Sequence, residues 1–89
     1  MKIKINKQEQ INDALNFINE KINKCLWHQQ IVEVKNYNAI LLTPYGAYLD
    51  VMDEVVKIYK SQNYDCFYKS AYDARGPHYC FYINKKHFE

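Results

Sequence analysis

The sequence predicts an α+β fold of the ferredoxin-like kind, in which two helices lie on one face of an antiparallel sheet. Two long segments carry apolar residues at spacings of three and four, as one buried face of a helix requires. Shorter segments around them alternate apolar and polar residues, which is typical of half-buried strands. The resulting order is β-α-β-β-α-β with an added C-terminal β-strand, all within a single domain of residues 1–89.

The first strand and the first helix are predicted next to each other at the N-terminal end. Isoleucines alternate with polar residues over residues 2–6, which favours a strand. Asn6 then stands at the N-cap of a helix, and Glu9 occupies the capping-box position three residues later. The helix is expected from about Lys7 to Lys24. Its apolar stripe consists of Ile11, Ala14, Leu15, Ile18 and Ile22.

A hairpin and the second helix are predicted in the middle of the chain. Residues 30–35 alternate, residues 36–38 suit a turn, and residues 39–42 are apolar on both faces, as in the interior of a sheet. Thr43 and Pro44 favour a helix start as N-cap and first helical residue. This helix is expected to end near Gln62 and Asn63. Its apolar stripe consists of Tyr45, Tyr48, Leu49, Met52, Val55, Val56 and Tyr59.

The most informative segment is an aromatic-rich hairpin near the C-terminus. A turn centred on Ala74 and Arg75 pairs Cys66 with Ile83, which puts Cys80 out of register for a disulfide with Cys66. Residues 85–87 are expected to be a frayed tail.

Composition limits the classes of function. The net charge is +2, with eleven lysines and one arginine, which by itself does not indicate a nucleic-acid-binding protein. No apolar run approaches the roughly 20 residues that span a bilayer, so no membrane partner is expected. Three cysteines without a signal-peptide pattern fit a reducing cytoplasm. The abundance of Lys, Asn, Ile and Tyr indicates an AT-rich genome, such as that of a low-GC bacterium or its phage.

The preferred interpretation is a small non-enzymatic protein-binding domain that docks the hairpin on a larger protein. Tyrosine and arginine together are typical of binding hot spots, and Arg75 is the single arginine of the chain. The target would be a host protein, such as a defence-system nuclease, that a phage or mobile element inhibits. An edge strand also permits a homodimer. The expected binding residues are Tyr68, Tyr72, Asp73, Arg75, His78, Tyr79 and Tyr82.

Two alternative interpretations give those tyrosines a different role. In the first, the tyrosines only cover the core and keep their hydroxyls in water. In the second, the open sheet face binds single-stranded nucleic acid through Lys2, Lys4, Tyr68 and Tyr72. The element order resembles that of RNA-recognition domains, whereas residues 2–6 and 39–42 lack the aromatic residues that such domains expose there.

A third interpretation is a small ribonuclease or phosphodiesterase, in which His78 and Arg75 supply a base and a phosphate-binding cation. Asp73 beside a turn glycine is first a turn former, and the sequence has no glycine-rich phosphate loop. Cys25 with His28, and His78 with Cys80, are weak zinc-ligand pairs without a C-x-x-C motif. No metal and no cofactor are therefore expected.

Overall fold

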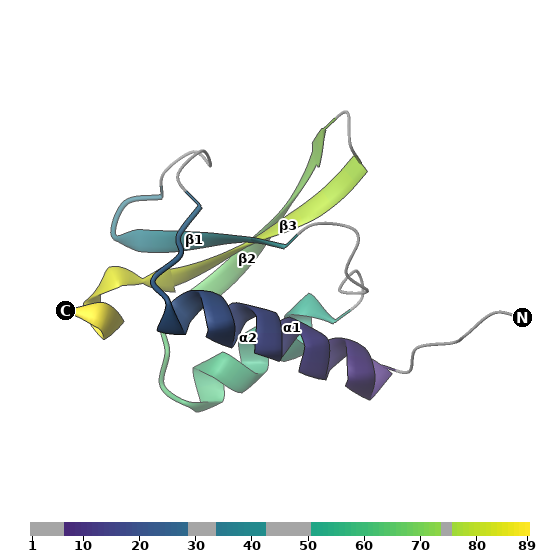
Figure 1. The fold of residues 1–89 in the computed structure, drawn as a ribbon, viewed down its shortest axis with the longest axis horizontal. Coiled ribbons are helices and arrows are strands. Elements are labelled where there is room, and N and C mark those ends of the chain that lie inside the picture. The colour runs from purple at the N-terminus through teal and green to yellow at the C-terminus, as the bar shows by residue number, and fades with distance from the viewer. Residues whose placement is uncertain (1–6, 29–33, 43–50, 74–75) are drawn as a thin grey trace, which may run out of the picture.

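The structure is a computed structural model that describes residues 7–28, 34–42, 51–73 and 76–89, with the backbone alone for residues 71–73, 76 and 77 (Figure 1). Two α-helices, three β-strands and a short 3₁₀ helix make up the described part. In chain order they are α1 (Lys7–Asn23), β1 (Tyr37–Leu42), α2 (Met52–Ser61), β2 (Cys66–Asp73), β3 (Gly76–Asn84) and the 3₁₀ helix η1 (Lys85–Phe88).

The strands form one antiparallel sheet in the order β1-β3-β2, which confirms the α+β class. Both β1 and β2 run antiparallel to β3 and are therefore parallel to each other, with α2 connecting them. The expected ferredoxin-like order, with residues 39–42 in a central strand, is not confirmed: among the described strands β3 is central and β1 lies beside it. The reason is visible in burial: Cys80 to Ile83 are buried at every position, whereas in β1 only Ile40 and Leu42 are.

Some expected strands and turns lie outside the described residues or differ from them. Residues 2–6 and 29–33 are not described, so two predicted strands cannot be placed. The turn expected at residues 36–38 comes earlier, because the Tyr37 N–H donates to the Val34 carbonyl at 3.0 Å and β1 already begins at Tyr37. Asn36 takes the left-handed backbone, with φ of 71°, that such a turn requires.

The first helix is confirmed, and the second is shorter than predicted. In α1 the buried residues Ile11, Ala14 and Ile18 follow the predicted stripe. The α2 helix begins at Met52 rather than at Pro44, since Val51 just before it has non-helical backbone angles. The predicted Thr43 cap lies outside the described residues.

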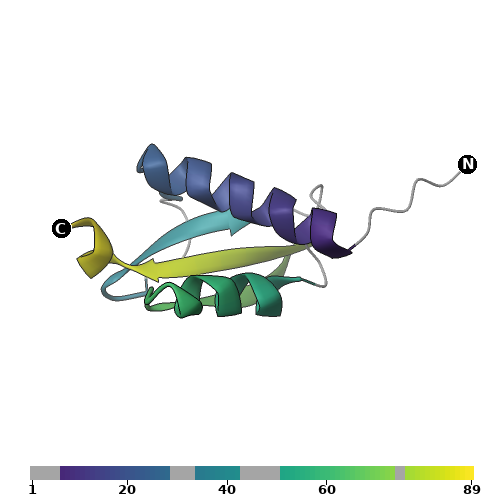
Figure 2. The ribbon, with the colours of Figure 1, turned by 90° about the horizontal axis from the view of Figure 1, so that it is seen from below.

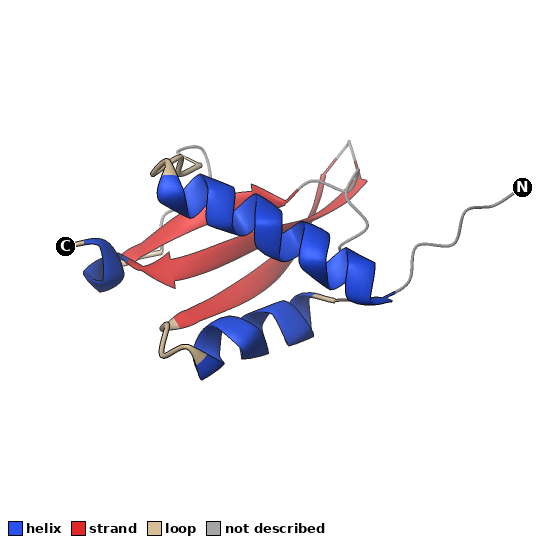
Figure 3. Ribbon diagram, turned by 60° about the horizontal axis from the view of Figure 1, so that its bottom comes forward, coloured by secondary structure: helices blue, strands red, loops and turns tan. Residues whose placement is uncertain are grey.

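Both helices pack on the same face of the sheet. In the view of Figure 2, β3 is seen between α1 and α2. Figure 3 shows both helices in front of the three strands. Side chains from the strands meet those of the helices in one core, whose largest fully buried member is Phe81. Lys7 of α1 pairs with Glu54 of α2 at 2.6 Å, and the Tyr59 hydroxyl of α2 donates to the Asn19 side chain of α1. Across the described ranges, no helix is long and apolar enough to cross a membrane.

The C-terminal residues expected to fray instead form η1. The Asn84 side chain accepts from the Lys86 N–H at 2.9 Å and caps this turn. Phe88 packs against Trp27, with ring centroids 5.0 Å apart. The His87 Nε2 accepts from the Asp65 N–H at 2.9 Å. The tail is ordered because an aromatic ring and a capped turn offset the entropy of fixing a chain end.

Candidate functional site

The predicted hairpin is present with the predicted pairing. Cys66 lies opposite Ile83, while Cys80 lies opposite Lys69, so the two cysteines are out of register as expected. Asp73 lies opposite Gly76, and the predicted turn centre between them is outside the described residues. The hairpin therefore brings its two aromatic runs together strand to strand.

The predicted binding residues are divided between the two faces of the sheet. Tyr68 and Tyr79 lie on the helix-covered face, where both pack against the core and their rings meet edge to face at 5.7 Å. The Tyr68 hydroxyl donates to Asp53 Oδ1 at 2.8 Å, and this bond raises the pKa of the tyrosine. His78 and Tyr82 lie at alternate positions of β3 that face away from the helices. Tyr82 is buried, at 4% exposure, rather than exposed.

The remaining predicted residues lie beyond what the structure describes. Lys2, Lys4 and Arg75 belong to ranges that are not described, and of Tyr72 and Asp73 only the backbone in β2 is given. For the nucleic-acid interpretation this matters, because Tyr68 is the one predicted residue with a described side chain, and it lies on the helix-covered face. The helix-free face of the sheet is made by other residues.

An aromatic cluster covers the helix-free face of the sheet. Phe67 of β2 stacks on Tyr82 of β3, with ring centroids 4.9 Å apart and an interplanar angle of 19°. The Tyr37 ring of β1 meets the Phe67 ring edge to face, with centroids 5.1 Å apart. Side chains of the two outer strands therefore contact each other across β3. The Lys69 ammonium lies 5.9 Å from the Phe67 ring and 6.0 Å from the Tyr82 ring. We call Tyr37, Phe67, Lys69 and Tyr82 the aromatic surface.

A polar anchor holds one side of the aromatic surface. The Tyr37 hydroxyl donates to Asp65 Oδ2 at 2.7 Å, and Asn84 Nδ2 donates to the same oxygen at 2.9 Å. Both hydrogen bonds lower the pKa of Asp65, and the bond to Asp65 raises the pKa of Tyr37. The Tyr37 ring is thus fixed before any partner arrives, which reduces the entropy lost on binding.

Sequence reasoning missed three of the four residues of the aromatic surface. Tyr37 falls in the predicted turn, and Phe67 and Lys69 belong to the predicted hairpin but not to the expected binding residues. Strand alternation offered the missing signal, because Phe67, Lys69, His78 and Tyr82 share one face once Cys66 is paired with Ile83.

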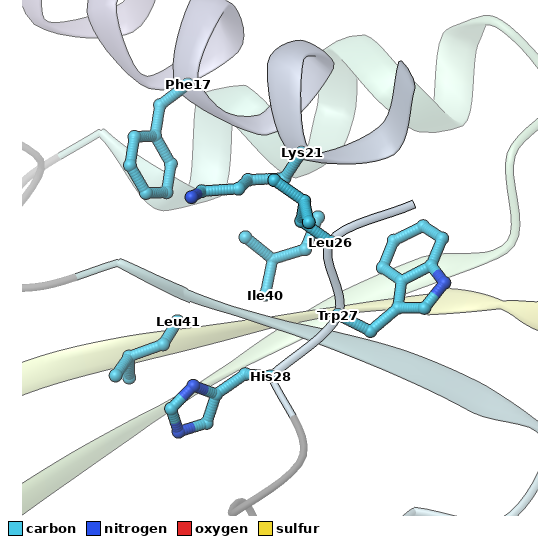
Figure 4. Close-up of a pocket in the computed structure, with 7 residues that line it drawn as sticks. All are labelled: Phe17, Lys21, Leu26, Trp27, His28, Ile40 and Leu41. Atoms are coloured by element: carbon cyan, nitrogen blue, oxygen red, sulfur yellow. The ribbon is translucent and has the colours of Figure 1, made fainter. Parts of the chain in front are cut away.

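A separate pocket of about 320 Å³ with a mixed polar and apolar lining lies between α1 and β1. Figure 4 shows it between Phe17 and Lys21 of α1 and the segment that follows the helix. The Lys21 ammonium lies 5.1 Å from the Phe17 ring, and the His28 N–H donates to the Ala39 carbonyl at 2.8 Å. The pocket is lined by Phe17, Lys21, Leu26, Trp27, His28, Ile40 and Leu41.

The cysteine and histidine side chains of the described residues do not come together in one site. No group of three or more His, Cys, Asp or Glu side chains there is placed to hold a metal ion. Cys66 and Cys80 are buried thiols whose pKa values are raised by burial, whereas Cys25 is exposed. A buried thiol with a raised pKa is a poor nucleophile, so neither Cys66 nor Cys80 suits covalent catalysis.

No family model, no curated protein and no solved structure matches the chain. The geometry of the helix-free face therefore carries the functional argument.

Proposed function

We propose that this chain is a small non-enzymatic protein-binding domain that docks the aromatic surface on a larger protein. The observation that carries the proposal is the stack of Phe67 on the buried Tyr82, with Lys69 above both rings, on the face opposite the two helices. Tyr37, Phe67 and Lys69 keep exposed surface and would make the contacts, while Tyr82 supports the Phe67 ring from below. Aromatic rings that are already fixed lose little side-chain entropy on binding and dominate the energetics of many interfaces.

The charge around this surface supports a protein partner. Lys69 is a single ammonium on the surface, and the Asp65 carboxylate lies at its border, bonded to Tyr37. Binding of a nucleic-acid backbone draws on several cations that neutralise phosphates. One face of the Phe67 ring is also already covered by Tyr82, which leaves less ring area for a base.

The biological setting that we favour is inhibition of a host protein by a phage or mobile element, in the cytoplasm of the host cell. It is supported by the small size and by the Lys-, Asn-, Ile- and Tyr-rich composition. Arg75, Tyr72 and Asp73 remain predicted members of the interface at the hairpin tip. The mechanism is steric: the domain covers a surface that the target needs.

A capture experiment tests the proposal. Tagged wild type and a Lys69→Glu variant are used to capture partners from lysate of the source organism or its host, with and without nuclease. Lys24→Glu is the matched control, because Lys24 is also exposed and its pair with Glu20 on the surface of α1 contributes little to stability. We expect one stoichiometric protein that survives nuclease, is retained by Lys24→Glu and is lost with Lys69→Glu. Retention by both variants would disprove a role for the aromatic surface.

Single-stranded nucleic acid is the second candidate, and the cation above two aromatic rings is the observation that favours it. Salt dependence separates the two functions. Phosphate contacts make affinity fall steeply with salt, whereas an aromatic protein interface gives a shallow dependence. Enrichment that disappears with nuclease would support this second candidate.

A further inference from the structure

The backbone N–H and C=O groups of β2 point alternately toward β3 and toward the outer edge of the sheet. One hydrogen bond next to the strand shows which residues point which way. The Asn84 N–H donates to the Asp65 carbonyl at 2.9 Å, so these opposing residues stand at a hydrogen-bonded position of the ladder, although the Asp65 N–H itself donates to His87 Nε2. Bonded and non-bonded pairs alternate along an antiparallel ladder. The next residues of β2 that bond to β3 are therefore Phe67 and Lys69, which lie opposite Tyr82 and Cys80.

The intervening residues Cys66, Tyr68 and Ser70 consequently direct their backbone N–H and C=O groups away from β3. Within the described ranges, no backbone hydrogen bond from these three residues to another element occupies that edge. The hydrogen bonds between β3 and β1 follow the same alternation. The Lys85 N–H, one residue after Asn84, points to the β1 side and donates to the Asn36 carbonyl at 2.8 Å. A row of unpaired backbone groups is a template for a further strand.

A groove of about 470 Å³ follows this edge, between α2 and β2. Figure 2 shows α2 over the β2 side of the sheet, next to that strand. Val56 supplies an apolar contact, being almost fully buried at 8% exposure. A groove that combines an open strand edge with pockets for alternate side chains suits the addition of a peptide strand. We call this the edge groove, and it is lined by Asp53, Val56, Lys57, Lys60, Phe67 and Tyr68.

The edge groove carries a net positive charge, because its lining has two lysines against the one carboxylate of Asp53. Lys57 and Lys60 are exposed on α2, and within the described part neither forms an ion pair. The carboxylate of Asp53 in the groove already accepts from the Tyr68 hydroxyl at 2.8 Å. Lysines often guard strand edges, but the Lys69 ammonium lies over the rings of the helix-free face instead.

We propose that the edge groove binds an extended acidic segment of a partner protein, which joins the sheet as a strand beside β2. Its backbone pairs with Tyr68 and Ser70, and its acidic side chains on the helix side lie against Lys57 and Lys60. A second copy of the chain brings the same lysines, and residues 1–6 carry two lysines of their own, so like charge disfavours both as occupants. The inference rests on the proposed protein-binding function but uses the β2 edge and the lysines of α2, and Phe67 is the one groove residue that also belongs to the aromatic surface.

Selection from a displayed library of random nine-residue peptides tests this inference. Wild type is the bait, the double variant Lys57→Glu, Lys60→Glu is the counter-bait, and Lys24→Glu, Lys35→Glu is a control with the same change of net charge. We expect enriched peptides with alternating acidic residues, which bind the counter-bait at least tenfold more weakly and the control about as well as wild type. The inference is overturned if no peptide is enriched, or if the enriched peptides are basic or neutral.

Amide hydrogen exchange with the best enriched peptide then locates the binding. In the free protein the amides of Tyr68 and Ser70 should exchange much faster than those of Phe67 and Lys69, and the peptide should slow them at least tenfold. Protection elsewhere overturns the inference. So does concentration-dependent protection of Tyr68 and Ser70 without peptide, because a second copy would then occupy the edge. Capture through the aromatic surface can succeed or fail independently of either result.

Discussion

Phe67 of β2 stacks on Tyr82 of β3 with ring centroids 4.9 Å apart, on the face of the sheet opposite the helices. The two residues lie directly opposite each other in the β2–β3 ladder. The stack therefore links the hairpin strands and at the same time forms the centre of the aromatic surface.

A double-mutant cycle with Phe67→Leu and Tyr82→Leu measures this stack. Aromatic pairs contribute about 0.5–1.5 kcal/mol beyond the area that they bury. We expect a coupling free energy of this size from urea denaturation of the two single variants and the double variant. Additive losses would contradict a direct interaction between the rings.

The helix-covered face should be more sensitive to truncation than the helix-free face. Phe81 is fully buried in the core, whereas Leu41 of β1 is half-buried on the opposite face. Phe81→Ala should lower the free energy of unfolding by about 3–5 kcal/mol, the usual cost of deleting a buried aromatic ring. Leu41→Ala serves as the comparison and should cost clearly less. Equal losses would mean that the core is not where the structure places it.

The Asp65 anchor should make stability depend on pH at the acidic end. Hydrogen bonds from Tyr37 and Asn84 lower the pKa of Asp65 below its ordinary value of 3.8. A lowered carboxyl pKa gives a stabilisation that is present above pH 3.8 and is lost as the pH falls through the folded-state pKa.

Thermal unfolding of wild type and Asp65→Asn between pH 7 and pH 2 checks this expectation. Wild type should be the more stable at pH 7. The difference should shrink as the pH falls below about 4, where the unfolded state binds the proton first, and it should vanish below the folded-state pKa, where both states bind it. Tyr37→Phe removes one donor and should reduce the same pH dependence in part. A difference between wild type and Asp65→Asn that grows toward acid would contradict the anchor.

The three cysteines should react at two very different rates. Cys25 is exposed, whereas Cys66 and Cys80 are buried thiols with pKa values raised by burial. A thiol reagent at pH 8 should modify one cysteine quickly in the folded protein and all three in denaturant, since the thiolate is the reactive form. Cys25→Ser should remove the fast phase. A second fast thiol in the native state would contradict the packing of β2 or β3.

The sequence predicted the helices, strands and pairings that depend on residues close together in the chain. The α1 stripe follows from helical spacing, and the pairing of Cys66 with Ile83 follows from turn chemistry between two aromatic runs. The central place of β3 could not be read this way, because strand order depends on contacts between distant segments. The predicted central place of residues 39–42 depends on strands at residues 2–6 and 30–35, of which residues 2–6 and 30–33 lie outside the described residues.

The candidate site was predicted in part. The hairpin was identified, and Tyr82 belongs to the aromatic surface, but the face of each tyrosine depends on the register. Tyr68 and Tyr79 turn toward the helices, where they complete a small core. Tyr37 joins the surface from β1, and its contact with Phe67 spans 30 positions of sequence, from 37 to 67, which no local pattern encodes.

The most direct test of a protein-binding aromatic surface is site-specific photo-cross-linking in cells of the source organism or its host. A photoreactive residue replaces Lys69 above the Phe67 and Tyr82 rings, or replaces the exposed Lys24 just after α1 as the control. The account predicts one discrete protein adduct from position 69 that resists nuclease and is absent from position 24. The absence of an adduct at position 69, an equal adduct at position 24, or an adduct that nuclease removes would contradict it.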